Sequence, residues 1–299
     1  MSYRFIFFLF FSLVGVTQQL AAEENADQYQ GIFVVANVQF TLCHELTHAL
    51  IAILDVPVLG REEDAADQIS AICFLHPTDE NLRDPKALEK LVAVADAWRL
   101  EWELDKDSGG TAYWDEHALD IQRYYQVLCV LYGSDPERFE DLPDKLELPW
   151  QRAWSCADYE YDRIAKATQW LLETYGVRDD ASTSRRTGKV GVLYEEPGEN
   201  KRRAHKMLEK AALFEHKANL MNSLFNLPHD IAIVGADCLG DTTAYWNEDR
   251  REVVFCYELV ERFVLLADLR QCILGRSFSL ANRRPMESAR IQKCLIDVL

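Results

Sequence analysis

Residues 32–54 read IFVVANVQFTLCHELTHALIAIL and contain neither glycine nor proline. Most positions are apolar, and Pro57 and Gly60 follow soon after the stretch ends. An apolar stretch of this length, closed by a proline and a glycine, predicts a buried helix. The polar side chains at residues 44–48, near its C-terminal end, therefore need a partner in the interior.

These polar residues, His44-Glu45-Leu46-Thr47-His48, match the pattern H-E-x-x-H. Residues four apart share one face of a helix, so both imidazoles can bind one zinc ion, with Glu45 beside the open coordination position. The alternative interpretation is a pair of hydrogen-bonded core histidines. Two histidines and a glutamate in an apolar helix are costly without a partner, which favours the metal site.

A catalytic zinc ion needs a third protein ligand. Glu63 lies fifteen residues after His48, which leaves room for a turn and an antiparallel helix, and Asp67 shares its face. This arrangement is similar to gluzincins, in which such a glutamate binds zinc and an aspartate one turn later supports a ligand histidine. We predict these roles for Glu63 and Asp67, with Glu62 or Asp64 as alternative ligands. An acidic first turn that complements the helix dipole would explain Glu62 and Glu63, but not Asp67.

A second polar cluster begins at Asp115-Glu116-His117, and Asp120 follows within one helical turn. A histidine beside carboxylates can stabilise a tetrahedral oxyanion, so we predict that role for His117, with Asp120 in support. Tyr124 or Tyr125 is the alternative donor. The competing interpretation is a solvated, capped start of a helix.

The rest of the chain predicts a helical first half and a mixed second half. Helices are expected over residues 61–75, 84–104, 114–132 and 150–175. After a polar linker at 178–189, the pattern predicts strands at 190–195 and 230–237, a hairpin at 242–257, and helices at 199–225 and 258–274.

The expected fold class is therefore α+β and mostly helical, with a zincin-like active-site helix. Residues 23–177 would form the helical zinc-binding part. Only a short segment precedes His44, too short to build the sheet that aligns an extended substrate in zincins. We expect residues 190–299 to supply a small mixed sheet in cis and to complete the same catalytic domain.

The N-terminus predicts export. Arg4 precedes an apolar run from Phe5 to Val16, and Ala21-Ala22 provides small residues for cleavage, which indicates a signal peptide over residues 1–22. The apolar run is short for a membrane span, so no stable span is expected after cleavage, although an uncleaved anchor is the alternative. The expected location is periplasmic or secreted.

Eight cysteines form an even set in this exported chain, which favours disulfides. They include no CxxC pair, which disfavours a cysteine zinc site. The preferred pairs are Cys129–Cys156 and Cys238–Cys256, because each would join neighbouring elements. The net charge of −17 argues against nucleic acid or an anionic membrane as a partner, because both select for basic surfaces.

Together these segments resemble a family of exported bacterial metallopeptidase-like proteins of unknown function. The similar blocks extend over roughly residues 32–270, which makes them far more specific than HExxH alone. They are HELTHALI (44–51), VLGREEDAADQ (58–68), DEHALDIQRYY (115–125), CVLYGSDP (129–136), RAWSCADYEY (152–161), LPHDIAIV (227–234) and a block from Cys238 to Val260.

The resemblance implies a gluzincin-type zinc hydrolase and adds weight to functional roles for His117, Asp120, Gln122 and Arg123. In that family the strand-rich block precedes the HExxH helix, whereas here it follows, so the chain looks circularly permuted. Chain termini often lie close together, and such a rearrangement is compatible with a fold. The leading hypothesis is a zinc metallopeptidase acting on a peptide or protein. The alternatives are a non-catalytic exported zinc-binding module and a zinc amidase acting on a non-peptide or cell-wall substrate.

Overall fold

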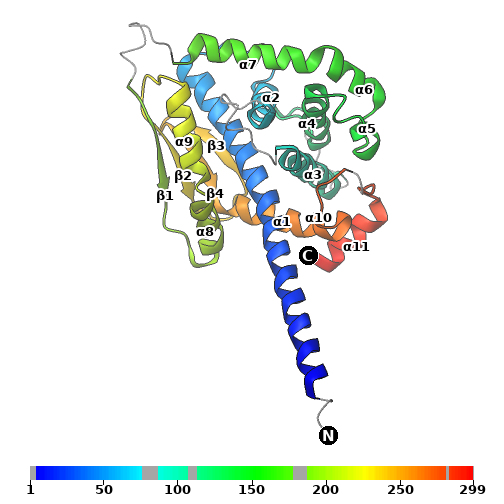
Figure 1. The fold of residues 1–299 in the computed structure, drawn as a ribbon. Helices are drawn as coiled ribbons and strands as arrows, with labels where there is room; N and C mark the ends of the chain where they lie inside the picture. Colours follow the sequence, from blue (N-terminus) through cyan, green and yellow to red (C-terminus); the bar gives the residue numbers. More distant parts are fainter. Residues whose placement is uncertain (1–4, 76–86, 107–112, 178–186, 281–282, 299) are drawn as a thin grey trace.

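Helix α1 (Phe5–Leu54) passes through the middle of the molecule and carries the HExxH residues near its C-terminal end (Figure 1). The computed structural model describes residues 5–75, 87–106, 113–177, 187–280 and 283–298, with side chains from residue 28 onward. The helix begins earlier than Ile32, the predicted start, because the alanine- and glutamate-rich segment before it favours helix. Its N-terminal part extends away from the body of the molecule (Figure 1).

Six further α-helices of the described part belong to the first half, and the first two of them pack directly against α1 (Figure 1). They are α2 (Glu62–Leu75), α3 (Ala87–Asp105), α4 (Asp120–Ser134), α5 (Leu142–Lys145), α6 (Trp150–Ser155) and α7 (Tyr161–Tyr175), with a π-helical turn at Cys156–Glu160. The predicted helices at 61–75, 84–104 and 150–175 are confirmed where the structure describes them. Residues 76–86, which include the predicted start at Asp84, lie outside the described part.

The helix predicted over 114–132 begins later than expected, at Asp120. The side chain of Asp115 accepts a hydrogen bond from the backbone N–H of His117 at 2.8 Å. This local bond favours a turn over a helix. The first helical turn instead begins after Leu119, whose backbone N–H donates to the side chain of Gln122.

The second half supplies a four-stranded mixed sheet in the order β1-β2-β4-β3. The strands are β1 (Val190–Tyr194), β2 (Ile231–Ala236), β3 (Ala244–Asn247) and β4 (Glu252–Cys256). β1, β2 and β4 are parallel, whereas β3 pairs antiparallel with β4 at the edge of the sheet. The predicted strands and hairpin are confirmed, and so is the mostly helical α+β fold class. Most of the predicted linker, residues 178–186, lies outside the described part.

The helices of the second half pack against the sheet, against α1 or against one another. They are η3 (Glu199–Lys201), α8 (Arg202–Ala211), α9 (Leu213–Leu224), α10 (Tyr257–Leu274) and α11 (Ser288–Val298). The single helix predicted at 199–225 is interrupted, because Ala212 adopts a left-handed conformation with φ 49° and separates α8 from α9. α8 and α9 lie over the sheet, on the side shown in Figure 1.

One hydrophobic core includes residues from both halves of the chain, among them Phe33, Leu128, Phe214 and Phe255. α1 contacts β3 and β4, so the HExxH helix lies directly beside the sheet. The sheet is thus built in the same chain as the helix that it flanks.

A buried ion pair also joins the two halves. The carboxylate of Asp96 in α3 accepts hydrogen bonds from Arg270 in α10, at 2.6 Å, and from Arg283. Both Asp96 and Arg270 are fully buried. The hydroxyl of Tyr29 in α1 donates to the carbonyl of Ala267 nearby.

Three disulfides are present, and they account for six of the eight cysteines. Cys129–Cys156 and Cys238–Cys256 confirm the two predicted pairs. Cys272–Cys294, which was not predicted, joins α10 to α11. Such disulfides are consistent with an exported protein.

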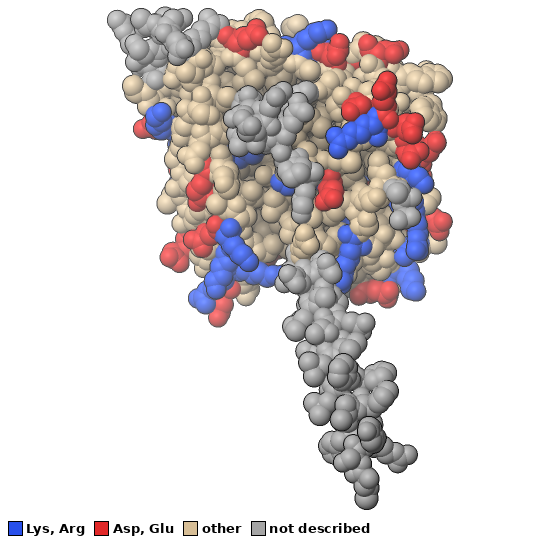
Figure 2. Space-filling model, in the orientation of Figure 1, with Lys and Arg blue, Asp and Glu red and all other residues tan. Residues whose placement is uncertain are grey.

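The exposed surface carries charges of both signs. On the face in Figure 2, acidic and basic side chains are interspersed among uncharged residues. Within the described part of the chain, none of the helices has an apolar stretch sufficient to cross a membrane.

Candidate metal centre

His44 and His48 lie one turn apart on α1, and their side chains converge. The two Nε2 atoms are 3.1 Å apart. Glu63 comes from the first turn of α2, which the loop after α1 brings back beside the motif. One Glu63 oxygen lies 2.9 Å from Nε2 of His44, and the other lies 3.4 Å from Nε2 of His48. These three residues offer ligand atoms close enough to hold one metal ion.

The remaining ring nitrogens of both histidines contact carboxylates. Nδ1 of His44 lies 2.9 Å from Oδ1 of Asp67, and Nδ1 of His48 lies 2.7 Å from Oε1 of Glu62. A carboxylate on Nδ1 fixes the orientation of the ring and leaves Nε2 directed at a metal. Glu62, an alternative ligand in the sequence analysis, thus lies on the far side of His48 from Glu63. Asp64, the other alternative, pairs with Arg61 at 3.0 Å.

Asp67 is held in turn by Arg123 of α4. The guanidinium donates to both carboxylate oxygens of Asp67, at 2.7 and 2.6 Å, and stacks on the ring of Trp98 at 3.6 Å. Asp67 is buried, and burial raises the pKa of its carboxyl, but the charges of Arg123 and His44 and the hydrogen bonds with both residues together outweigh burial and lower the pKa to about 2. Asp67 is therefore a fixed anion beside His44.

The histidines and carboxylates of the cluster shift each other's pKa values. Burial lowers the pKa of His44 and His48, but hydrogen bonds to the carboxylates outweigh it and raise both, that of His48 to about 9. Burial likewise raises the pKa of Glu63, but hydrogen bonds with His117, His44 and His48 hold it well below its usual value. The acidic side chains thus favour positive charge at this point, as a cation site requires.

Glu45 lies beside this cluster and lines a cavity of about 270 Å³ with His44, His117 and Asp120. The residue is only 8% exposed. Burial raises the pKa of its carboxyl, against the opposing effect of His44 and His48. A buried carboxylate facing a cavity next to metal ligands is suited to accept a proton from a group bound there.

His117 reaches the cluster from the turn before α4. Its Nε2 lies 3.0 Å from a Glu63 oxygen, and its Nδ1 lies 2.9 Å from Asp115. The hydrogen bond with Glu63 raises the pKa of His117 to about 9. Asp120 lies at the start of α4 and lines the same cavity, and burial raises the pKa of its carboxyl to about 6.

The structure does not bring Tyr124 to this cavity. Its side chain is buried on the core side of α4, and its hydroxyl donates to the backbone carbonyl of Leu146. Tyr124 is buried together with Val127 and Leu128, which follow one turn later on α4, and the sequence pattern around 115–125 does not separate it from the neighbouring Tyr125.

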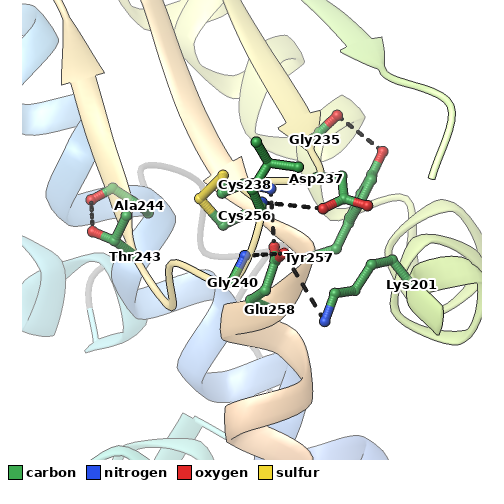
Figure 3. Close-up of a disulfide and its surroundings, with 11 residues drawn as sticks. Lys201, Gly235, Asp237, Cys238, Gly240, Thr243, Ala244, Cys256, Tyr257 and Glu258 are labelled. Carbon is green, nitrogen blue, oxygen red and sulfur yellow. Dashed lines mark hydrogen bonds and ion pairs between the residues drawn. A yellow bond between two sulfur atoms is a disulfide. The ribbon is translucent and has the colours of Figure 1, made fainter. Parts of the chain in front are cut away.

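Sheet residues form another wall of the cavity. Thr242 and Thr243 precede the edge strand β3, Ala244 is its first residue, and all three line the cavity. The loop before them is tied by the Cys238–Cys256 disulfide and by Glu258 (Figure 3). The Glu258 carboxylate accepts hydrogen bonds from the backbone N–H groups of Cys238 and Gly240, at 3.1 and 3.0 Å.

A second group of potential ligands is formed by Cys238, Cys256 and Glu258. Its two sulfurs are joined in the disulfide, so they are not available as thiolates. These three residues therefore hold the loop in place. The candidate metal centre is the set of His44, His48 and Glu63.

Comparison with protein families places the chain in one of them. A family model described as "Putative metallopeptidase" matches residues 7–172 and 194–269. The chain belongs to this family, whose description suggests a metal-dependent, peptidase-like function. Comparison with curated proteins and with solved structures found no match.

Proposed function

We propose that the protein is a zinc-dependent hydrolase, specifically a peptidase. The observation that carries this proposal is the spacing of the donor atoms of His44, His48 and Glu63, between 2.9 and 3.4 Å. Two ligand atoms bound to one tetrahedral zinc ion at its usual distances lie about 3.3 Å apart. The set therefore fits zinc without rearrangement of the two helices.

The chemistry of the donors also favours zinc. Two imidazoles and one carboxylate form a ligand set typical of catalytic zinc, which leaves a fourth position open. Asp67 and Glu62 on the Nδ1 atoms supply the outer hydrogen bonds that such histidines need. Calcium and magnesium prefer sites built from oxygen atoms, which this set is not.

Zinc bound there would act as a Lewis acid and lower the pKa of a coordinated water toward neutrality. In the proposed reaction, the carboxylate of Glu45 accepts a proton from the attacking water and passes it to the leaving amine. His117, protonated and held by Asp115, donates a hydrogen bond to the oxyanion. Asp67 acts through His44 and is a positioning residue.

A peptide substrate is supported by the edge strand at the cavity. β3 pairs with β4 on one side only, and the cavity extends to its first residue, Ala244. An extended peptide binds an exposed strand edge through backbone hydrogen bonds. The protein would act outside the cytoplasm, in the periplasm or after secretion, which the disulfides and the apolar N-terminal segment support.

The test is Glu45→Gln, assayed with a library of quenched peptides and with zinc content measured on the same samples. The expected result is zinc binding equal to the parent chain and loss of peptide cleavage by a factor of about 10² to 10⁴. Asp64→Asn is the matched control, because it changes a partly exposed acid whose ion-pair partner among the described residues is Arg61. Cleavage by the Glu45→Gln variant at the parent rate would overturn the assigned role. Zinc binding without cleavage of any peptide by the parent chain would favour a non-catalytic zinc module or a non-peptide amidase.

A further inference from the structure

The two cysteines outside the three disulfides lie together on another face of α1. Cys43 precedes His44 in α1, and Cys73 lies in the last turn of α2. The two helices that carry them pack extensively against each other. Both side chains line an apolar pocket of about 270 Å³, separate from the cavity at the metal centre.

The two thiols differ in accessibility. Cys73 is exposed, whereas Cys43 is buried with 6% of its surface accessible. Lys217 in α9 lines the same pocket. An accessible thiol beside a buried one in the same pocket is suited to react first with an external disulfide, and the buried thiol then resolves the product.

We propose that Cys43 and Cys73 form a fourth disulfide, which links α1 to α2 behind the candidate metal centre. Three other pairs are already joined in this chain, so its cysteines are used for disulfides, and these two form the remaining pair. Both line the same pocket, and they lie on two helices that pack against each other, so the fold brings them to one place. The pairing itself does not depend on the proposed activity.

The reaction is a thiol–disulfide exchange with a low-molecular-weight disulfide such as oxidised glutathione. The Cys73 sulfur attacks one glutathione sulfur, releases one glutathione thiol and forms a mixed disulfide. The Cys43 sulfur then attacks the Cys73 sulfur and releases the second glutathione thiol. The chain loses two thiol hydrogens and is oxidised by two electrons, while the glutathione disulfide is reduced to two thiols.

The position of this bond gives it a structural consequence. Cys43 directly precedes the ligand His44 in α1. Cys73 follows Glu63 and Asp67 in the same helix, α2. A covalent link there holds together the two helices that bring the metal ligands into contact. The loop that the bond closes, residues 43–73, lies entirely within the hairpin formed by α1 and α2.

The test exposes the full purified chain to oxidised glutathione, denatures it with N-ethylmaleimide present, and measures the intact mass and the digested peptides. The expected result is a chain with no alkylated cysteine and a cross-linked peptide that joins Cys43 to Cys73. Alkylation of both residues, or a stable glutathione adduct on Cys73, would overturn the proposal. This measurement uses the unmodified chain and needs no variant to fold.

Two single variants test the order of the reaction. Cys43→Ser removes the resolving thiol, so a stable glutathione adduct is expected on Cys73. Cys73→Ser leaves only the buried thiol, which should escape glutathione and be alkylated after denaturation. The reverse pattern would contradict the order. Mapping of the Cys272–Cys294 peptide in each variant serves as the control for folding.

Thermal unfolding provides a second readout. Oxidation should raise the Tm of the parent chain, because the bond restricts the unfolded chain. Oxidation of the double variant Cys43→Ser/Cys73→Ser should leave its Tm unchanged. An equal shift in both proteins would show that the effect arises elsewhere.

Discussion

Oδ1 of Asp67 lies 2.9 Å from Nδ1 of His44, and the same carboxylate is held by two hydrogen bonds from Arg123. A residue of α2 thereby fixes a side chain of α1, and a residue of α4 fixes the residue of α2. The orientation of the HExxH histidine thus depends on side chains from three helices. This relationship leads to the first prediction.

Asp67→Asn should weaken metal binding by about 10- to 100-fold, because loss of an outer hydrogen-bond partner is known to have effects of this size. The amide keeps the shape of the carboxylate but removes its charge. Competition with a chelator measures the change, and Asp64→Asn is the control. Equal affinity in the parent and in Asp67→Asn would show that Asp67 does not support the metal site.

A second pair of variants identifies the third ligand. Glu63→Gln should abolish stoichiometric binding of metal, because Glu63 contacts the Nε2 atoms of both histidines. Glu62→Gln should retain the metal with a smaller loss of affinity, because Glu62 contacts only Nδ1 of His48. Metal content after dialysis measures both. Loss of metal in Glu62→Gln together with retention in Glu63→Gln would reverse the assignment.

Much of this site follows from helical spacing. The interval of four between His44 and His48 predicts a shared face, and the interval from Glu63 to Asp67 does the same on α2. These intervals depend only on local geometry. The fold class was predictable for the same reason, since the apolar patterns of α10 and of strands β1, β2 and β4 are local signals.

Other parts of the site depend on contacts between distant residues. Arg123 reaches Asp67 across 56 positions and stacks on Trp98, and no local pattern indicates either contact. Residues before α4 form a turn because of the Asp115 side chain, so His117 reaches Glu63 from a loop. Tyr124 points into the core because packing against neighbouring helices decides which face of α4 is buried, and the motif does not indicate that face.

A third prediction concerns acid stability. Burial raises the pKa of Asp96, but Arg283 and Arg270 outweigh it and lower the pKa below the value of the unfolded chain. Its contribution to stability should therefore be complete above the unfolded pKa of about 3.9 and decline as the pH falls through the lower folded value. Urea unfolding from neutral to acidic pH measures this loss.

Asp96→Asn is the variant that isolates this effect. At neutral pH it should cost about 3–5 kcal/mol, because it leaves a buried guanidinium without its carboxylate. The same variant should show a smaller fall in stability with acid than the parent chain. Parallel curves for the two proteins would mean that Asp96 does not cause the acid sensitivity.

A fourth prediction concerns the loop that lines the cavity. Glu258→Gln removes the charge of the side chain that accepts from the backbone of Cys238 and Gly240. Hydrogen bonds to a charged acceptor are stronger than those to a neutral one, so the loop should be held less firmly. Metal content should be unchanged, whereas peptide cleavage should fall. Hydrogen exchange of residues 238–243 measures the loosening, and unchanged exchange would contradict the role given to Glu258.

The central claim is that His44, His48 and Glu63 bind one zinc ion, and the most direct test is the zinc content of the purified chain. Mass spectrometry of the metal should find about one zinc per chain in the parent, and none in His48→Ala. His216→Ala, which changes an exposed histidine of α9, should keep the parent value. Absence of zinc from the folded, reconstituted parent chain, or full retention in His48→Ala, would contradict the account.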